Sequence, residues 1–140
     1  MSEEAPAYTA TVLVYSDDRT VRESVRLALG SRVAADLPEI EVVECATPDA
    51  AVAAVDVNRF DLLVLDGEAV PLGGTGLTRQ LKDEVADCPP VLLLVARVQD
   101  AWLARWARAE AITPYPIDPV RLPGQVADLL RVRLAEKAVL

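Results

Sequence analysis

The chain has 140 residues, of which 52% are hydrophobic and 26% are charged, and this balance predicts a globular chain of about one domain and not a disordered segment. Its 14 Lys and Arg residues stand against 22 Asp and Glu residues, and the net charge of -8 excludes nucleic acid as an expected direct partner because like charges repel. The sequence contains no histidine, which removes the commonest general base and the imidazole ligands of zinc sites.

The first residues of the chain show no sign of a targeting segment. Residues 1–8 carry two acids and Pro6 and lack the basic start and apolar run of a signal peptide, so they are expected to form a disordered lead-in to a single domain at 9–140. No apolar run approaches the roughly 18 residues of a membrane-spanning helix, so direct membrane insertion is not expected. We expect a cytoplasmic protein. If it works at the inner face of the cell membrane, a partner complex would have to hold it there.

Apolar runs alternate with segments of helical periodicity along the chain. Short runs rich in Val, Leu and Ile predict strands, most of them buried on both faces, at 11–15, 40–45, 60–66, 91–95 and 111–115. Segments with helical spacing or helix-start residues follow them, at 21–29, 48–58, 77–85, 100–110 and 118–138. The alternation predicts an α/β fold, a doubly wound five-stranded parallel sheet with helices on both faces.

A glycine-rich segment follows the third predicted strand. Residues 67–76 contain Pro71 and four glycines, and this composition predicts a loop. We therefore expect the third helix to begin only at Leu77, after the last of these glycines.

Acidic residues stand at the ends of two predicted strands. Ser16, Asp17 and Asp18 follow the first strand, and Asp66 ends the third. Sites in open parallel sheets form at the carboxyl ends of the strands, where converging carboxylates favour a hard divalent cation such as Mg²⁺. A carboxylate there can also act as a nucleophile that accepts a phosphoryl group. Alternatively, Asp17 and Asp18 serve only to cap the first helix, but Asp17 and Asp66 together favour a site.

Several motifs, taken in their order and spacing, resemble those of response-regulator receiver domains. They are the segment 12–18 with Arg22, the strand 63–66, Pro71 with Gly76 and Leu77, the strand 90–96, and the segment 115–119. The resemblance covers residues 10–135 and implies a CheY-like (βα)5 fold that is regulatory and has no catalytic residues. It implies that Asp66 is the phosphoacceptor, and that Asp17, Asp66 and the backbone carbonyl near Glu68 hold Mg²⁺.

The sequence departs from the receiver pattern at the positions on which switching depends. Ser16 stands where the first of two acids is usual, and the switch Thr or Ser falls on Val95. The usual Lys falls on Tyr115, and the aromatic switch position falls on Ile112. The loop after the phosphoacceptor is longer than usual, which makes the carbonyl ligand near Glu68 insecure.

These departures remove the contacts that a phosphoryl group would use. A lysine beside a phosphorylated aspartate supplies about 1.5–3 kcal/mol, and a hydroxyl supplies about 1 kcal/mol more. Moving a two-state equilibrium substantially takes several times the thermal energy, so little remains to drive a switch. We interpret the chain as an atypical receiver with an impaired phosphorylation switch and, at most, a weak Mg²⁺ site.

Three residues are candidates for an interface with another protein. Trp102 and Trp106 lie four positions apart in the fourth predicted helix, and Tyr115 follows the fifth strand. Large aromatic side chains often anchor protein interfaces. The alternative is that one tryptophan packs inward while the other lies beneath Arg105 or Arg108. The bond between Tyr115 and Pro116 resembles one that is cis in receivers.

Three functions remain open from the sequence. The first is a stand-alone receiver that acts as a protein-interaction module. Its residue pattern, at 14–17, 65–69, 80–84, 88–90 and 102–104, resembles that of orphan receivers found with the respiratory NADH dehydrogenase (complex I) of some high-GC bacteria. This resemblance implies an accessory subunit docked on the cytoplasmic arm of that complex. The second is a phosphorylatable single-domain regulator in a two-component phosphorelay, with a histidine kinase as partner. The third, least favoured, is a flavodoxin-like cofactor binder, because Asp17 and Asp18 would repel its phosphate.

Overall fold

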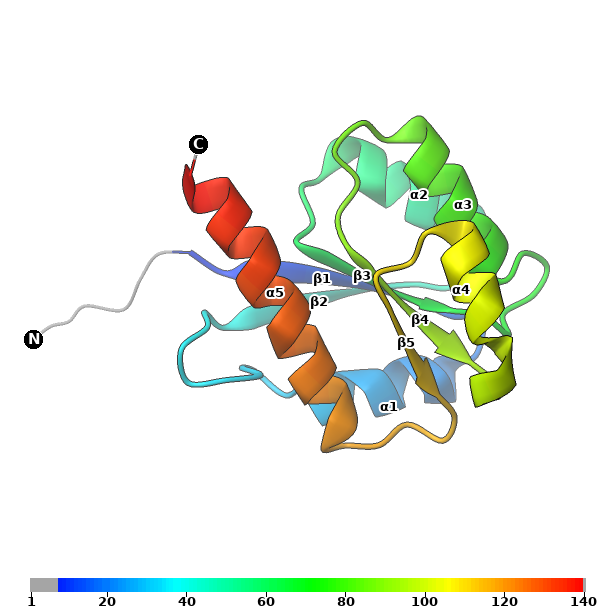
Figure 1. Ribbon diagram of the computed structural model, residues 1–140, viewed down its shortest axis with the longest axis horizontal. Helices are drawn as coiled ribbons and strands as arrows, with labels where there is room; N and C mark the ends of the chain where they lie inside the picture. Colours follow the sequence, from blue (N-terminus) through cyan, green and yellow to red (C-terminus); the bar gives the residue numbers. More distant parts are fainter. Residues whose placement is uncertain (1–7, 140) are drawn as a thin grey trace, which may run out of the picture.

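A computed structural model describes residues 8–139, so most of the expected lead-in, residues 1–7, lies outside the described residues. Five parallel strands form one sheet in the order β2-β1-β3-β4-β5, and helices alternate with them, which confirms the predicted doubly wound α/β architecture (Figure 1). The strands are β1 (Ala10–Tyr15), β2 (Ile40–Cys45), β3 (Leu62–Asp66), β4 (Val91–Val95) and β5 (Ala111–Pro114). The helices are α1 (Arg19–Leu29), α2 (Pro48–Val57), α3 (Gly74–Glu84), α4 (Ala101–Ala107) and α5 (Arg121–Val139).

The sheet lies between two layers of helices, and each layer closes its own hydrophobic core. Helices α1 and α5 cover one face, where Val12 and Val14 point, and helices α2, α3 and α4 cover the other, where Leu13 and Tyr15 point. Every residue of β3 and β4 is buried, because both faces of these strands are covered. This two-sided burial explains why their sequences are continuous apolar runs.

Helix α1 ends at Leu29, as the sequence pattern predicts, and begins at Arg19, two residues before the predicted segment 21–29. The carboxylate of Asp18 accepts a hydrogen bond from the backbone N–H of Thr20 at 2.9 Å and so caps the first turn. Val25 and Leu29 are buried against the sheet, as their spacing of four predicts. Gly30 follows with a φ of 61°, a conformation that glycine adopts without a steric cost.

Helix α3 begins at Gly74, so the expectation of a loop up to Leu77 is wrong. The first turn of the helix lies against the end of β3, where a Cβ atom on Gly74 would stand only 2.8 Å from the carbonyl carbon and oxygen of Asp66. Glycine at this position therefore reflects a close approach of two backbones and not a flexible loop. The approach fixes α3 beside the strand end that carries Asp66.

Helix α4 is shorter than the predicted segment 100–110. A 3-10 turn at Val98–Asp100 precedes it, and Arg108 ends it in a left-handed conformation with a φ of 69°. The N–H of Arg108 donates back to the carbonyl of Arg105 at 3.1 Å, which closes the last turn.

Helix α5 is preceded by an aspartate cap. The carboxylate of Asp118 accepts hydrogen bonds from the backbone N–H groups of Val120 and Arg121, so the regular helix begins three residues after the predicted start. Within residues 8–139, neither α5 nor any other helix is long and apolar enough to cross a membrane.

We predict that Gly74→Ala lowers the free energy of unfolding by about 1–3 kcal/mol, because the added methyl group meets the backbone of β3. The matched control is Gly124→Ala in α5, where a Cβ atom would meet nothing within 4 Å. This control should raise stability by about 0.5–1 kcal/mol, since alanine favours a helix over glycine. Urea denaturation of both variants measures the difference, and equal effects would contradict the close approach.

Candidate functional site

The carboxyl ends of β1 and β3 lie side by side at one edge of the sheet. The two strands are neighbours, and Tyr15 pairs with Leu65, so the next residues, Ser16 and Asp66, are adjacent. The prediction that Asp17 and Asp66 stand at neighbouring strand ends is therefore confirmed. Their environments differ, since Asp66 is 3% exposed and Asp17 is on the surface.

Both carboxylate oxygens of Asp66 accept hydrogen bonds from the protein. The hydroxyl of Ser16 donates to Oδ2 at 2.7 Å, and the backbone N–H of Glu68 donates to Oδ1 at 2.9 Å. The same Ser16 oxygen accepts a hydrogen bond from the N–H of Asp18 at 3.0 Å. A buried carboxylate is costly unless such donors satisfy it, so Ser16 and Glu68 hold Asp66 in place. No local sequence pattern indicates these two donor roles.

Arg22 fixes the turn that carries Ser16. Its Nη1 donates to the carbonyl oxygen of Ser16 at 2.7 Å, and its Nε donates to Glu44 of β2 at 3.0 Å. Arg26 reaches the second oxygen of Glu44 at 2.8 Å. The hydrogen bond from Arg26, followed by that from Arg22, holds the pKa of Glu44 below its usual range. The end of β1 is therefore tied to both α1 and β2.

The oxygen donors at this edge fit Mg²⁺ only in part. Asp17 and Asp66 supply two carboxylates, but Ser16 supplies a hydroxyl whose hydrogen already bonds to Asp66. Within residues 8–139, no group of three or more acidic, cysteine or histidine side chains is placed to hold a metal ion. Mg²⁺ requires near-octahedral oxygen ligation and usually keeps several waters, so water and a backbone carbonyl would have to complete the ligation that Asp17 and Asp66 begin. The carbonyl ligand expected near Glu68 stays a prediction.

Tyr115 stands beside this edge from the loop after β5. Its backbone N–H donates to the carbonyl oxygen of Val95 at 2.9 Å, and its buried hydroxyl has no hydrogen-bond partner among residues 8–139. Burial is the main cause that raises the pKa of Tyr115, and the negative charges of Asp66, Glu68 and Asp18 raise it further. The hydroxyl is therefore a neutral donor near Asp66. The bond from Tyr115 to the next residue is cis, as the resemblance suggests.

Val95 and Ile112, the other two positions that depart from the receiver pattern, place apolar side chains in apolar surroundings. Val95 is 2% exposed and packs with the α2, α3 and α4 layer, next to the β4 residue that pairs with Asp66. Ile112 of β5 is partly buried against the same layer. Neither side chain offers a hydrogen bond, so neither can contact a phosphoryl oxygen on Asp66.

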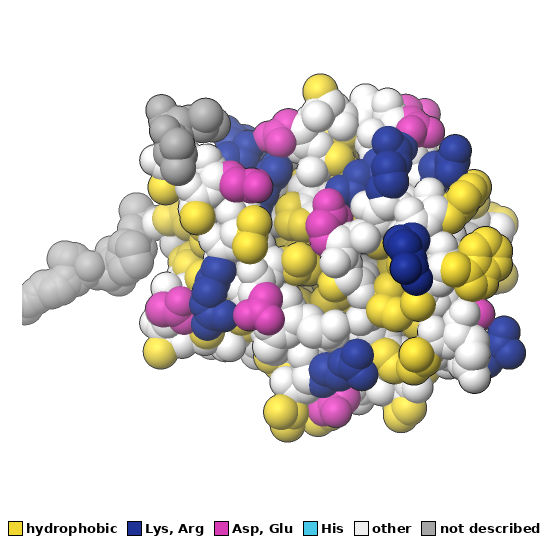
Figure 2. Space-filling model, viewed as in Figure 1, with side chains coloured by type: hydrophobic (Ala, Val, Ile, Leu, Met, Phe, Trp, Pro, Cys, Tyr) yellow, Lys and Arg dark blue, Asp and Glu magenta, His cyan; other side chains and the backbone are white. Residues whose placement is uncertain are grey.

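Both tryptophans of α4 lie on the surface and are strongly exposed for such large apolar side chains. Trp102 is 61% exposed and Trp106 is 50% exposed, so the alternative in which one packs inward is wrong. An arginine does cover Trp106, but it is Arg79 from α3, whose guanidinium carbon lies 4.2 Å from the ring centroid. Figure 2 shows apolar and basic side chains together on the side of the molecule where α4 lies.

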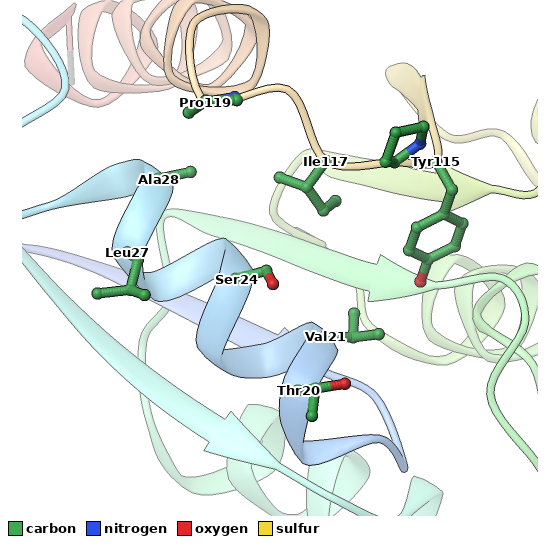
Figure 3. Close-up of a pocket in the computed structure, with 9 residues that line it drawn as sticks. Thr20, Val21, Ser24, Leu27, Ala28, Tyr115, Ile117 and Pro119 are labelled. Carbon is green, nitrogen blue, oxygen red and sulfur yellow. The ribbon is translucent and has the colours of Figure 1, made fainter.

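An apolar groove of about 470 Å³ separates α1 from the loop between β5 and α5 (Figure 3). Tyr115 stands at one end of this groove, and Ile117 lies between the loop and α1. The sequence analysis does not predict the groove, although Leu27 is an apolar residue on the outer side of an amphipathic helix. The other lining residues are Thr20, Val21, Ser24, Ala28, Pro116 and Pro119.

Comparison with curated sequences finds two relatives in Mycobacterium tuberculosis, from the strains CDC 1551 / Oshkosh and H37Rv. Each carries the name of an uncharacterized response regulatory protein, and each is 51% identical over 120 residues. The matched part is 86% of this chain and 90% of the relative. No family model matches the sequence.

Solved receiver structures share the fold. A response regulator of Chloroflexus aurantiacus J-10-fl is 24% identical with a TM-score of 0.76, over 89% of this chain and 99% of that one. The receiver domain of the Francisella response regulator 1452 is 18% identical with a TM-score of 0.75, over 88% and 98%. A CheY-like receiver of Methanospirillum hungatei JF-1 is 18% identical with a TM-score of 0.74, over 92% and 99%. At these identities the likeness concerns the fold alone.

We predict that Ser16→Ala lowers the free energy of unfolding by about 1–3 kcal/mol, because the buried Asp66 carboxylate loses a hydrogen-bond donor. Ser24→Ala on the exposed side of α1 is the control, and its effect should stay within about 0.5 kcal/mol. Urea denaturation at neutral pH measures both variants. A Ser16→Ala variant as stable as the control would show that the hydrogen bond contributes nothing.

We also predict that all three tyrosines ionise at a higher pH in the folded protein than in the unfolded chain. Burial of its hydroxyl and the hydrogen bond that this hydroxyl donates to Asp61 raise the pKa of Tyr8 to about 12, and burial is the main cause that raises the pKa values of Tyr15 and Tyr115. The unfolded chain releases these protons near pH 10 while the folded chain retains them, so stability falls as the pH rises above about 10.

Absorbance of tyrosinate at alkaline pH tests this prediction directly. The tyrosinate step of the folded protein should lie at a higher pH than that of the urea-unfolded protein, in which all three tyrosines ionise near pH 10. Tyr115→Phe removes one of these protons, so its stability should fall less steeply with pH. A full tyrosinate step near pH 10 in the folded protein would contradict the burial of these hydroxyls.

Proposed function

Because the chain belongs to the family of response-regulator receiver domains, we propose that it acts as an atypical stand-alone receiver, a regulatory module that works by binding another protein. The observation that carries the proposal is the state of Asp66, whose two oxygens already accept hydrogen bonds from Ser16 and Glu68. The relatives support the stand-alone reading, because the matched 120 residues make up 90% of each.

The conventional phosphorylation switch is impaired in this proposal. A phosphoryl group on Asp66 would bring negative charge next to Val95 and Tyr115, which provide neither a cation nor the usual switch hydroxyl. The Tyr115 hydroxyl is one neutral donor in place of a lysine, whose charged hydrogen bond is worth about 1.5–3 kcal/mol. Phosphorylation would then shift the conformational equilibrium little, because the shift is limited by the contacts that differ between the two states.

Mg²⁺ belongs to the proposal as a weak ligand. Receivers typically bind it at the phosphorylation site, and here Asp17 and Asp66 would hold it with the backbone carbonyl near Glu68. When bound, the ion would screen the negative charge of the two carboxylates. Less screening by a cation is needed here, because the hydroxyl of Ser16 donates a hydrogen bond to Asp66 at the place where a further carboxylate would repel it.

The proposed partner is the respiratory NADH dehydrogenase complex, with the chain as an accessory subunit on its cytoplasmic arm. The support is the sequence resemblance to orphan receivers that accompany this complex. Such docking would hold a cytoplasmic protein at the inner face of the cell membrane. Trp102, Trp106 and Tyr115 remain the candidate contacts, of which the two tryptophans are on the surface. A histidine kinase is the partner in the alternative phosphorelay function.

Affinity purification of the tagged full chain from its native cell tests the partner. We expect subunits of the NADH dehydrogenase to be recovered in equal amounts with the natural chain and with Asp66→Asn, because binding does not require phosphorylation. Recovery of no large complex would overturn the docking proposal. Recovery of a histidine kinase that is lost in Asp66→Asn would favour the phosphorelay instead.

A gain-of-function experiment tests the impaired switch. We predict that the natural chain binds beryllofluoride with Mg²⁺ at least about tenfold more weakly than the variant Val95→Thr with Tyr115→Lys, which regains a hydroxyl and a charged donor. The control is the same double variant with Asp66→Asn, which should not bind. Calorimetry measures the affinities, and tight binding by the natural chain would contradict an impaired switch.

A further inference from the structure

Helix α4 presents its large side chains to solvent and its small ones to the core. Ala104 and Ala107 are buried, whereas Trp102 and Trp106 are 61% and 50% exposed. Val98, in the turn before the helix, is 63% exposed and continues the spacing of four. These tryptophans are the only two in the sequence, and an exposed apolar row of this kind marks an interaction surface.

Contacts with α3 hold this row in one arrangement. The guanidinium of Arg79 covers the ring of Trp106 and also donates to the Trp106 carbonyl oxygen at 3.3 Å. One turn away, Arg108 forms an ion pair with Asp83 of α3. Because α4 is fixed at both points, a partner that binds there would spend little free energy on ordering the surface.

The charge around the row is opposite to that of the whole chain. The chain carries a net charge of -8, yet Arg79 and Arg105 flank the tryptophans. Among the described residues, neither of these arginines forms an ion pair, whereas the nearby Arg97 and Arg108 pair with Asp100 and Asp83. Two uncompensated positive charges beside apolar rings complement a partner that carries both carboxylates and an apolar side chain.

We propose that this surface, the tryptophan face (Val98, Trp102 and Trp106 with Arg79 and Arg105), binds an acidic and partly apolar segment of another protein. An apolar side chain of the segment packs against the two indole rings, and its carboxylates pair with Arg79 and Arg105. The proposal rests on the proposed function as a binding module and adds the location of the interface and the chemistry of the partner.

A second copy of the chain is a poor occupant of the same face. Two copies that meet there would bring Arg79 and Arg105 of one copy against the same arginines of the other. Each copy also carries a net charge of -8, so the approach as a whole is repulsive. A different protein avoids both costs.

Site-specific photo-crosslinking in the native cell tests the proposal. The full chain carries a benzophenone amino acid at position 102, and the control carries it at position 27 on α1, where Leu27 is 74% exposed. We expect position 102 to capture peptides of another protein that are rich in Asp and Glu, at a yield at least about tenfold above position 27. Capture of a second copy, of a basic peptide, or of nothing would overturn the proposal.

Charge reversal separates a specific contact from a sticky aromatic surface. With the crosslinker at position 102, Arg105→Glu should lower the yield at least about fivefold, whereas Arg105→Lys should retain most of it. Arg105 is exposed and has no ion pair among the described residues, so neither change should affect folding, which thermal denaturation checks. A yield that is the same in both variants would overturn the pairing with carboxylates.

The outcomes distinguish this proposal from the docking on NADH dehydrogenase. If that complex is recovered by affinity purification but position 102 captures no acidic peptide, the tryptophan face is not the interface while the proposed function stands. If position 102 captures an acidic segment of an unrelated protein, the tryptophan face is an interface and the proposed partner is wrong.

Discussion

The burial of β3 and β4 on both faces is the constraint from which the remaining structure follows. A strand covered on both sides can place a polar side chain only where it ends, and parallel strands all end at one edge of the sheet. Asp66 is the last residue of β3 and stays buried there, so it needs donors from its neighbours. The turn after β1 supplies the Ser16 hydroxyl, and the loop after β3 supplies the N–H of Glu68.

Much of this arrangement was predictable from local pattern. Continuous apolar runs predict the buried strands, and their alternation with helices predicts the parallel sheet that brings Asp17 and Asp66 to one edge. The hydrogen bond from Ser16 was not predictable, because it depends on the register of β1 against β3. The sequence pattern predicts a loop where α3 begins at Gly74, since glycine serves both flexible loops and close backbone approaches. The contact of Arg79 with Trp106 joins residues 27 positions apart, for which no local pattern exists.

The domain lacks the usual switch groups at Val95 and Tyr115 and carries an exposed aromatic row on α4, and these two features do not conflict. Val95 belongs to the core layer formed with α2, α3 and α4, and Ala104 of α4 packs in that same layer. A Val side chain at the end of β4 has no polar group through which a change at Asp66 would pull on α4. A surface of α4 that keeps a single shape is what the proposed binding face, held by Arg79 and Arg108, requires.

The hydroxyl of Ser16 has a consequence for how the chain meets its surroundings. Where several carboxylates share a pocket, the folded form depends on the supply of a counterion, and its shape follows the ionic content of the cell. Here the hydroxyl satisfies one oxygen of Asp66 from within the chain. This hydrogen bond comes from within the chain and needs no bound cation, so the turn after β1 is held against the end of β3 whether or not Mg²⁺ is present, while Asp17 and Asp66 keep their negative charges.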